Sequence, residues 1–166
     1  MPCALTRGDC RFGRVAVTRV AYAVDGWGVG ELWLAEGLVV EIDHPRPGRQ
    51  ATRGHVLGER LANWFAGSRD DFLDVELDLD WATPFTRALV DALRRVPYGE
   101  TVTYGELAAL AGRPAAARAA GTFCARNRFA VVVPCHRVVA AGGLGGYGSL
   151  GLEYKRRLLD VERATL

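Results

Sequence analysis

The feature that most constrains the fold is a change of residue pattern at Thr83-Pro84, midway along the 166-residue chain. Before this point apolar and polar residues alternate, which is typical of half-buried strands, and after it apolar residues recur at helical spacing. Thr followed by Pro also predicts a helix N-terminus, because Thr caps a helix and Pro fits its first position. We therefore expect an α+β protein of two lobes, an α/β lobe over residues 1–82 and a helical lobe over residues 83–166.

The first half predicts a small, mostly antiparallel sheet. An alternating run begins near Val15, and two apolar-rich segments, 31–35 and 38–43, are joined at Glu36-Gly37 in the pattern of a hairpin. The Pro- and Gly-rich stretch 44–48 is expected to end the sheet.

A helix and one further strand follow in the first half. Apolar residues over 52–66 have helical spacing, and Gly67 stands where a C-terminal glycine belongs. Val75, Leu77 and Leu79 then alternate with acidic residues. This alternation predicts a half-buried strand whose acidic outer face is ordinary solvated surface.

Two short helices are predicted in the middle of the second half. Thr103 and Glu106 form a capping box for a helix that ends at Gly112, and Pro114 starts a second helix running to about Arg126. This pattern fits a helix-turn-helix, and an ordinary helical hairpin is the alternative. Small residues dominate the second helix around Arg118, so one of its surfaces is able to lie close against a flat or grooved partner.

Composition and charge narrow the class of protein. Apolar residues make up 49% of the chain and charged residues 24%, which fits a globular protein with its own core. Residues 1–83 carry 9 basic and 13 acidic side chains, a net charge of −4, whereas residues 84–166 carry 12 and 6, a net charge of +6. The basic second half makes a polyanion a plausible partner.

The location of the protein is predicted from what the sequence lacks. Its apolar stretches are too short for a membrane span, and the charged start does not resemble a signal peptide. Four scattered cysteines do not form a disulfide framework, so reduced thiols are expected. We therefore expect a cytoplasmic protein without membrane contact.

The candidate reactive group is Cys135. The apolar run Val131-Val132-Val133 predicts a buried strand that ends at Pro134-Cys135-His136-Arg137, followed by a glycine-rich loop over 142–148 and a closing helix to about Glu162. A thiol beside a histidine serves as a nucleophile when a base or positive charge lowers its pKa. A structural cysteine is the alternative, because buried inert cysteines are frequent.

The second half resembles the O6-alkylguanine-DNA alkyltransferases over about residues 83 to 162. The resemblance is carried by motifs in a fixed order, namely Val96-Pro97-Tyr98-Gly99, Thr103-Tyr104-Gly105-Glu106-Leu107-Ala108, Arg118-Ala119-Ala120-Gly121, Asn127, Pro134-Cys135-His136-Arg137-Val138 and Gly146-Tyr147-Gly148. The first half matches this family only in general architecture.

The resemblance implies a single-turnover DNA repair protein. By it, Cys135 attacks the alkyl carbon on guanine O6 and keeps the group as a thioether, with His136 as base through a water and Glu162 orienting that base. Asn127 would join the network, and Tyr104 would donate a proton toward the leaving guanine. The thiol makes the transfer without a catalytic cofactor.

The resemblance also implies a DNA surface and a pocket. The partner would be double-stranded DNA containing O6-alkylguanine, bound by a monomer through the minor groove after the base is flipped out. Arg118 would fill the gap left by the flipped nucleotide. The other implied DNA contacts are Thr103, Ala115, Ala116, Ala119 and Gly121, and the implied pocket residues are Pro134, Tyr147, Gly148 and Ser149.

The chain departs from the family pattern at two places. Arg128 stands where family members usually have proline. Gly148-Ser149-Leu150 replaces a glycine-rich run after Tyr147, with one extra residue before Lys155 and one fewer before Tyr147. Gly148 and Ser149 therefore both remain candidates for the backbone amide that meets guanine O6.

The sequence argues against a zinc site and against two other functions. Some relatives bind structural zinc, but Cys3, Cys10, His44 and His55 lack the short paired spacing of a zinc site. A lesion sensor without chemistry would have replaced Cys135. A cysteine hydrolase using Cys135 and His136 would leave Arg118 and its alanine-lined helix without a purpose.

Overall fold

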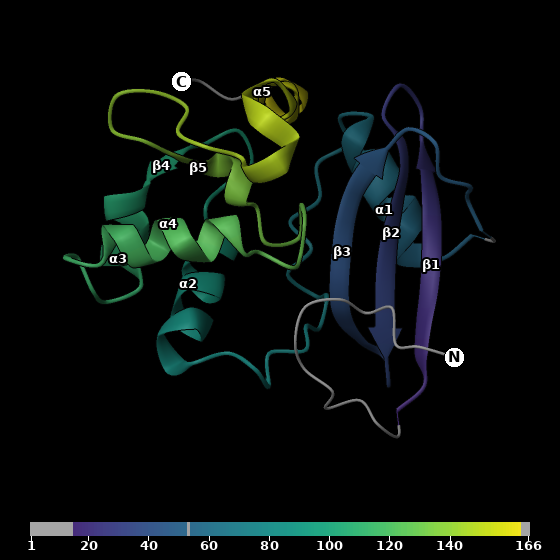
Figure 1. Ribbon diagram of the computed structural model, residues 1–166, viewed down its shortest axis with the longest axis horizontal. Coiled ribbons are helices and arrows are strands. Elements are labelled where there is room, and N and C mark those ends of the chain that lie inside the picture. The colour runs from purple at the N-terminus through teal and green to yellow at the C-terminus, as the bar shows by residue number, and fades with distance from the viewer. Residues whose placement is uncertain (1–14, 53, 164–166) are drawn as a thin grey trace.

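The structure is a computed structural model that describes residues 15–52 and 54–163. A three-stranded antiparallel sheet in the order β1-β2-β3 occupies one side, and most of the helices gather on the other side (Figure 1). The strands are β1 (Val17–Val24), β2 (Gly28–Ala35) and β3 (Leu38–Arg46). This arrangement confirms the predicted two-lobe α+β architecture.

The predicted hairpin turn is present between β2 and β3. Glu36 and Gly37 both have positive φ, 51° and 85°, which is the backbone conformation of a tight two-residue hairpin. The expected end of the sheet at residue 44 is wrong, because β3 continues through His44 and Pro45. Proline is tolerated there since β3 is an edge strand, where its missing N–H breaks no ladder.

Helix α1 (Val56–Phe65) begins later than the predicted residue 52. Thr52 is held by β1 instead, because its Oγ1 accepts a hydrogen bond from the Ala21 N–H at 2.9 Å and its own N–H donates to the Ala21 carbonyl. The His55 side chain then caps the helix by accepting from the Leu57 N–H. Gly67 has φ +94° just after the helix, as predicted.

The segment around Val75 to Leu79 is extended, but the predicted strand is wrong. Only Leu77 forms a bridge, to Val39, through two backbone hydrogen bonds of 2.9 and 2.8 Å. Nearby carbonyls are taken by Arg94, which donates to the Phe72 and Val75 oxygens. A side chain therefore binds backbone groups that a regular ladder would have used.

Residues 84–163 contain four α-helices and two very short strands. The helices are α2 (Pro84–Arg94), α3 (Tyr104–Leu110), α4 (Ala117–Ala125) and α5 (Gly151–Glu162), and the parallel strands are β4 (Val102–Thr103) and β5 (Val138–Val139). Thr83 caps α2 and the Thr103–Glu106 capping box starts α3, as predicted. Helix α4 begins at Ala117 rather than at the predicted Pro114, so Ala115 and Ala116 precede it.

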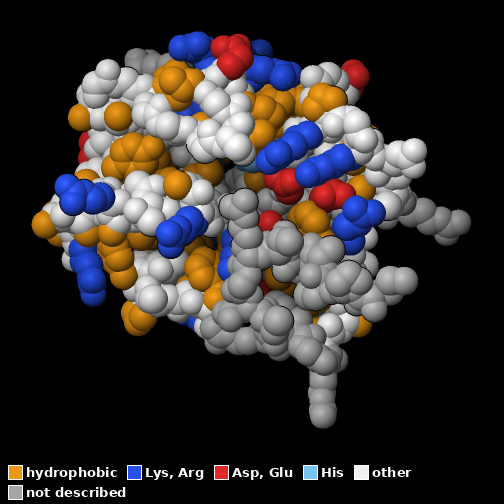
Figure 2. All heavy atoms as spheres, in the orientation of Figure 1, with side chains coloured by type: hydrophobic (Ala, Val, Ile, Leu, Met, Phe, Trp, Pro, Cys, Tyr) orange, Lys and Arg blue, Asp and Glu red, His pale blue; other side chains and the backbone are white. Residues whose placement is uncertain are grey.

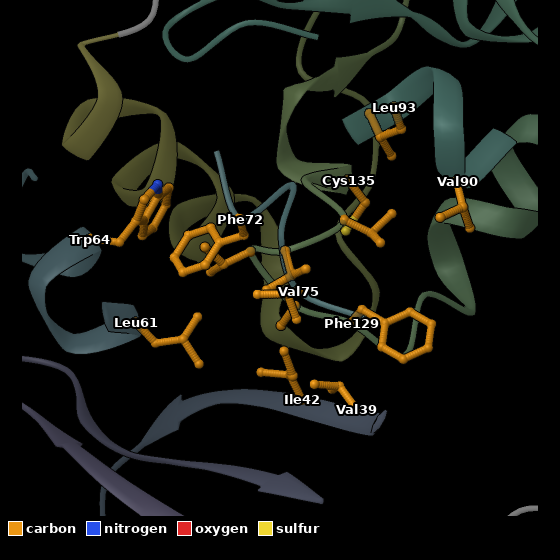
Figure 3. Close-up of a cluster of buried hydrophobic side chains, with 14 of the residues drawn as sticks. Val39, Ile42, Leu61, Trp64, Phe72, Val75, Val90, Leu93, Phe129 and Cys135 are labelled. Atoms are coloured by element: carbon orange, nitrogen blue, oxygen red, sulfur yellow. The ribbon is translucent and has the colours of Figure 1, made fainter. Parts of the chain in front are cut away.

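One hydrophobic core joins the two halves. Residues of β3, α1 and α2 lie together with Phe129 and Cys135 in the close-up of Figure 3. The backbone also connects them, since the Ile42 N–H donates to the Arg128 carbonyl at 2.7 Å and the Ala130 N–H donates to the Ile42 carbonyl at 3.2 Å. None of the helices within residues 15–52 and 54–163 is both long and apolar enough to cross a membrane.

Candidate active site and DNA-binding surface

Cys135 starts a single 3-10 turn, η2 (Cys135–Arg137), and is 8% exposed. The predicted strand Val131–Val133 is wrong, although all three valines are buried as expected. The chain turns there instead, with Val131 at φ +69° and the Val133 N–H donating to the Phe129 carbonyl at 2.9 Å. Left-handed backbone at a β-branched residue is strained, so surrounding contacts must hold this turn.

Asn127 holds the turn that precedes Cys135. Its Nδ2 donates to the Val133 carbonyl at 2.7 Å, and its Oδ1 accepts from the Phe129 N–H at 3.0 Å. One amide side chain thus binds backbone groups on both sides of the turn. The structure places Asn127 against the backbone that leads to Cys135, and its part in the catalytic network stays a prediction.

The environment of Cys135 keeps its thiol protonated at rest. Burial raises the pKa of the Cys135 thiol, and this effect outweighs hydrogen bonds with Asn127 and Tyr147 and the positive charge of Lys155, which act in the opposite direction. The Cys135 sulfur lies 3.9 Å from the Tyr147 hydroxyl oxygen. Because only the thiolate attacks, the site needs a base at the moment of reaction.

The contacts of the His136 ring are those of a general base, with one ring nitrogen held in place and the other left to accept a proton. Its Nε2 lies 2.9 Å from the Glu162 Oε1, with both side chains fully buried. Its Nδ1 is also buried and has no hydrogen-bond partner among residues 15–52 and 54–163. Burial lowers the pKa of His136 against the opposing influence of Glu162, so the ring is neutral and Nδ1 is free to accept a proton.

Arg137 forms the other half of this buried network, which the sequence reasoning missed. Its Nη2 donates to the Glu162 Oε1 at 2.7 Å and its Nε to Oε2 at 3.0 Å, while Nη1 donates to the Val96 carbonyl. Burial alone would raise the pKa of Glu162, but hydrogen bonds from His136 and Arg137 lower it to about 2. The adjacency of Arg137 to His136 was the only signal in the sequence.

Lys155, the only lysine of the chain, supports the glycine-rich loop and was also missed. It is fully buried, and its Nζ donates to the Val138 and Leu144 carbonyls, each at 2.6 Å. The loop passes close to Tyr104, since a Cβ at Gly145 would lie 3.0 Å from the Tyr104 hydroxyl. Burial raises the pKa of Tyr104, so its hydroxyl stays a neutral proton donor.

The remaining predicted pocket residues lie around this loop. Pro134 is buried next to Cys135, and Tyr147 is half-buried with its hydroxyl toward the sulfur. Gly148 and Ser149 are exposed in the short turn η3 (Gly148–Leu150). The structure therefore brings Tyr147 to Cys135 and leaves Gly148 and Ser149 both available at the surface.

The predicted DNA contacts lie on and beside α4. Arg118, Ala115 and Ala119 are exposed, whereas Ala116 and Gly121 are half-buried. Over α3 and α4 the surface shows basic and hydrophobic side chains, whereas over α5 and the sheet basic and acidic side chains are mixed (Figure 2). The Thr103 hydroxyl is already engaged, because it accepts the Glu106 N–H of the capping box.

Comparisons with known proteins match this site. Residues 84–164 fit the family model described as 6-O-methylguanine DNA methyltransferase, DNA binding domain. A methylated-DNA–protein-cysteine methyltransferase of Methanopyrus kandleri is 40% identical over 130 residues, which cover 76% of this chain and 96% of that protein. The chain belongs to the methylated-DNA–protein-cysteine methyltransferase family.

Other members of the methyltransferase family are similar over most of the chain. A relative from Mycolicibacterium paratuberculosis is 50% identical over 106 residues, and this match spans 63% of the chain but only 62% of that protein. A crystal structure of Mycobacterium tuberculosis OGT in complex with DNA superposes with a TM-score of 0.73 at 35% identity, covering 87% of this chain and 92% of that one.

The possible zinc ligands named from the sequence are not brought into one described site. Cys3 and Cys10 lie outside the described residues. His44 instead contacts the Tyr147 hydroxyl at 2.8 Å, and His55 caps α1. Two surface hollows of about 320 and 460 Å³ are lined by none of the predicted catalytic, DNA-binding or pocket residues, so neither is the entrance to Cys135.

Proposed function

We propose that this family member repairs O6-alkylguanine in double-stranded DNA by moving the alkyl group irreversibly to its own Cys135. The observation that carries this proposal is the buried Nδ1 of His136, the residue that follows Cys135; this atom has no hydrogen-bond partner in the described part of the chain, and the opposite ring nitrogen is held by Glu162. That arrangement provides a nucleophile, a base and a group that orients the base. Arg137 keeps the Glu162 carboxylate charged and in place.

The transfer step needs only groups of this chain and the lesion. His136 takes the thiol proton through a water, and the sulfur electron pair forms a bond to the alkyl carbon. The bond from that carbon to guanine O6 breaks, its electron pair stays on the base, and the Tyr104 hydroxyl supplies a proton to the departing guanine. The thioether product has no good leaving group, so each chain reacts once, and we expect no catalytic cofactor.

The DNA would be bound along α4 by a single chain. Small residues at positions 115, 116, 119 and 121 let the helix approach the narrow minor groove, while Arg118 enters the base stack in place of the flipped nucleotide. Thr103, at the start of α3, is a further candidate contact. Binding of this kind depends weakly on sequence and weakens with salt, because phosphate contacts supply most of the affinity.

The pocket for the flipped base would lie between the loop and η2. Pro134 and Tyr147 would form its walls, and the amide of Gly148 or Ser149 would meet guanine O6. A reaction that needs a reduced thiol and chromosomal DNA fits the cytoplasm, which we propose as its location.

The decisive experiment is intact-protein mass spectrometry after incubation with a duplex that carries one O6-methylguanine. We expect one added methyl group per chain, mapped by peptide analysis to Cys135, and no gain in Cys135→Ser. An unchanged mass with tighter binding to the lesion duplex than to plain duplex would indicate a sensor. An unchanged mass with no preference for the lesion would return attention to hydrolysis.

Arg118 tests the base-flipping part of the proposal separately. In Arg118→Ala we expect slower methyl transfer from duplex DNA but unchanged transfer from the free base O6-benzylguanine, because a free base needs no flipping. Measuring both reactions by the same mass shift separates DNA handling from chemistry. Equal losses with both substrates would contradict the assigned role.

A further inference from the structure

A histidine from the first half of the chain reaches the active site. His44 lies near the end of β3, is 7% exposed, and has its Nε2 2.8 Å from the Tyr147 hydroxyl oxygen. Its ring makes edge contacts with Tyr147 and Tyr154, at centroid distances of 5.6 and 5.1 Å. The extension of β3 past its predicted end is what brings His44 to this place.

The surroundings of His44 determine which ring nitrogen carries the proton. Its Nδ1 is buried and has no hydrogen-bond partner among residues 15–52 and 54–163. A buried N–H donor without a partner is rarer than a buried acceptor without one, so Nδ1 holds the lone pair. Burial lowers the pKa of His44 to about 3, with the His136 ring acting in the same direction, so the ring carries only one proton. That proton sits on Nε2.

The direction of the hydrogen bond follows from this tautomer. With Nε2–H as donor, the Tyr147 oxygen is the acceptor, and the hydroxyl proton of Tyr147 must point elsewhere. The Cys135 thiol donates a hydrogen bond to that same oxygen, with sulfur and oxygen 3.9 Å apart, so the sulfur is within reach of the hydroxyl proton once the thiol has lost its own. Hydrogen bonds to charged acceptors are the stronger ones, so a proton aimed at sulfur favours the thiolate over the thiol.

We propose that His44 is a positioning residue of the alkyl-acceptor site: by donating to the Tyr147 oxygen, it leaves the Tyr147 hydroxyl proton to be donated to the Cys135 thiolate once the thiol has lost its proton. This inference rests on the proposed function, because it assigns a part in activating the same nucleophile. It gives the first half of the chain a part in the chemistry, exerted through Tyr147. The proton of the thiol itself still leaves through His136.

Other charged and titratable groups lie around His44 and Cys135, but none of them takes the place of the hydrogen bond between His44 and Tyr147. Asp43, Arg46 and Tyr154 surround His44, but Asp43 is paired with Arg49 at 2.8 Å and the Tyr154 hydroxyl donates to the Pro45 carbonyl. Around Cys135 lie His136, Tyr104 and two further groups, Cys124 and the backbone-bound Lys155. The positive charge of Lys155 also favours the Cys135 thiolate. Lys155 is therefore left unchanged in every variant of the test, so that its effect is the same in all of them.

The test measures thiol reactivity without DNA. Carbamidomethylation of Cys135 by iodoacetamide is followed by peptide mass spectrometry across pH 6 to 10, roughly the range in which cysteines titrate. For His44→Leu we expect the reactivity midpoint to move to higher pH and the rate at pH 7 to fall about three- to tenfold. His44→Gln should keep most of the wild-type rate, because its amide N–H₂ is placed to donate to Tyr147.

A double-mutant cycle shows whether His44 acts through Tyr147. Tyr147→Phe removes one oxygen atom and should shift the midpoint in the same direction, and adding His44→Leu should then change nothing further. The proposal would be overturned by an unshifted pH profile in His44→Leu or in Tyr147→Phe. It would also be overturned by additive effects in the double variant, or by equal losses of rate in the Gln and Leu variants. Far-UV circular dichroism checks that each variant is folded. Because iodoacetamide reacts with the thiol without any DNA lesion, this test gives its result whether or not the protein repairs DNA. A failure of the His44 proposal and a failure of the proposed function can therefore be told apart.

Discussion

Glu162 illustrates how single residues serve both stability and chemistry. Its fully buried carboxylate is held by His136 and Arg137. A carboxyl whose folded pKa is depressed to about 2, against about 4.3 when unfolded, stabilises the fold above pH 4.3. That stabilisation, about 3 kcal/mol, is lost as the pH falls from about 4.3 through about 2.

The variant Glu162→Gln tests this contribution. It should lower the free energy of unfolding at pH 7 by about 3 kcal/mol, because Arg137 is left as a buried charge without a carboxylate. The difference from the wild type should shrink between pH 4.3 and pH 2, where the wild-type carboxyl takes up its proton. Urea unfolding at a series of pH values measures both free energies. A difference that stays constant over that interval would contradict the assignment.

At the scale of elements, α3 depends on its capping box. This helix has seven residues, and Thr103 and Glu106 bind each other's backbone N–H groups at its start. Thr103→Ala should cost about 1 kcal/mol in thermal or urea unfolding, since a backbone donor loses its acceptor. Thr103→Ser keeps the hydroxyl and should stay within about 0.5 kcal/mol of the wild type. Similar losses in both variants would mean that packing of the Thr methyl group, not the cap, matters.

Helix α4 offers a matched pair of variants for the proposed DNA surface. Ala119 and Ala125 are both exposed on this helix, but six residues apart they lie on different faces. Ala119→Leu should weaken duplex binding without loss of stability, because the larger side chain holds the helix away from the minor groove. Ala125→Leu should bind as the wild type does. Fluorescence anisotropy with labelled duplex measures both, and equal affinities would exclude this face as the contact.

At the scale of the whole molecule, the shared core predicts that the two halves unfold together. Phe129 of the second half bridges to Ile42 of β3, and both are buried in one cluster (Figure 3). All four tryptophans lie between residues 27 and 81, whereas four of the five α-helices that the structure describes lie in the second half. Tryptophan fluorescence and far-UV circular dichroism therefore follow different halves.

The variant Phe129→Ala makes this test quantitative. It should lower stability by about 3 to 5 kcal/mol, the usual cost of a cavity left by a buried aromatic ring. Both spectroscopic midpoints in urea should coincide in the wild type and shift by the same amount in the variant. Midpoints that separate, or that respond unequally, would show two independently folding units.

Local signals in the sequence determined much of the fold. The Glu36-Gly37 turn, the Thr83 cap and the Thr103 capping box each depend on neighbouring residues alone, so a pattern a few residues long was enough to predict them. The motif around Cys135 likewise predicted the family. Whether each predicted site residue performs its role stays a prediction, although the His136–Glu162 contact fits the role assigned to Glu162.

Features that depend on partners far away in the chain were decided by the tertiary structure. The valines at 131–133 are strand formers by composition, yet the Asn127 amide binds their backbone and turns the chain, so local propensity lost to specific hydrogen bonds. The partners of Lys155 and of His44 lie 9 to 17 and 103 residues away along the chain. The periodicity of apolar residues cannot predict contacts between residues so far apart in the sequence. Such burial and hydrogen bonding exist only after the sheet and helices have packed into one core.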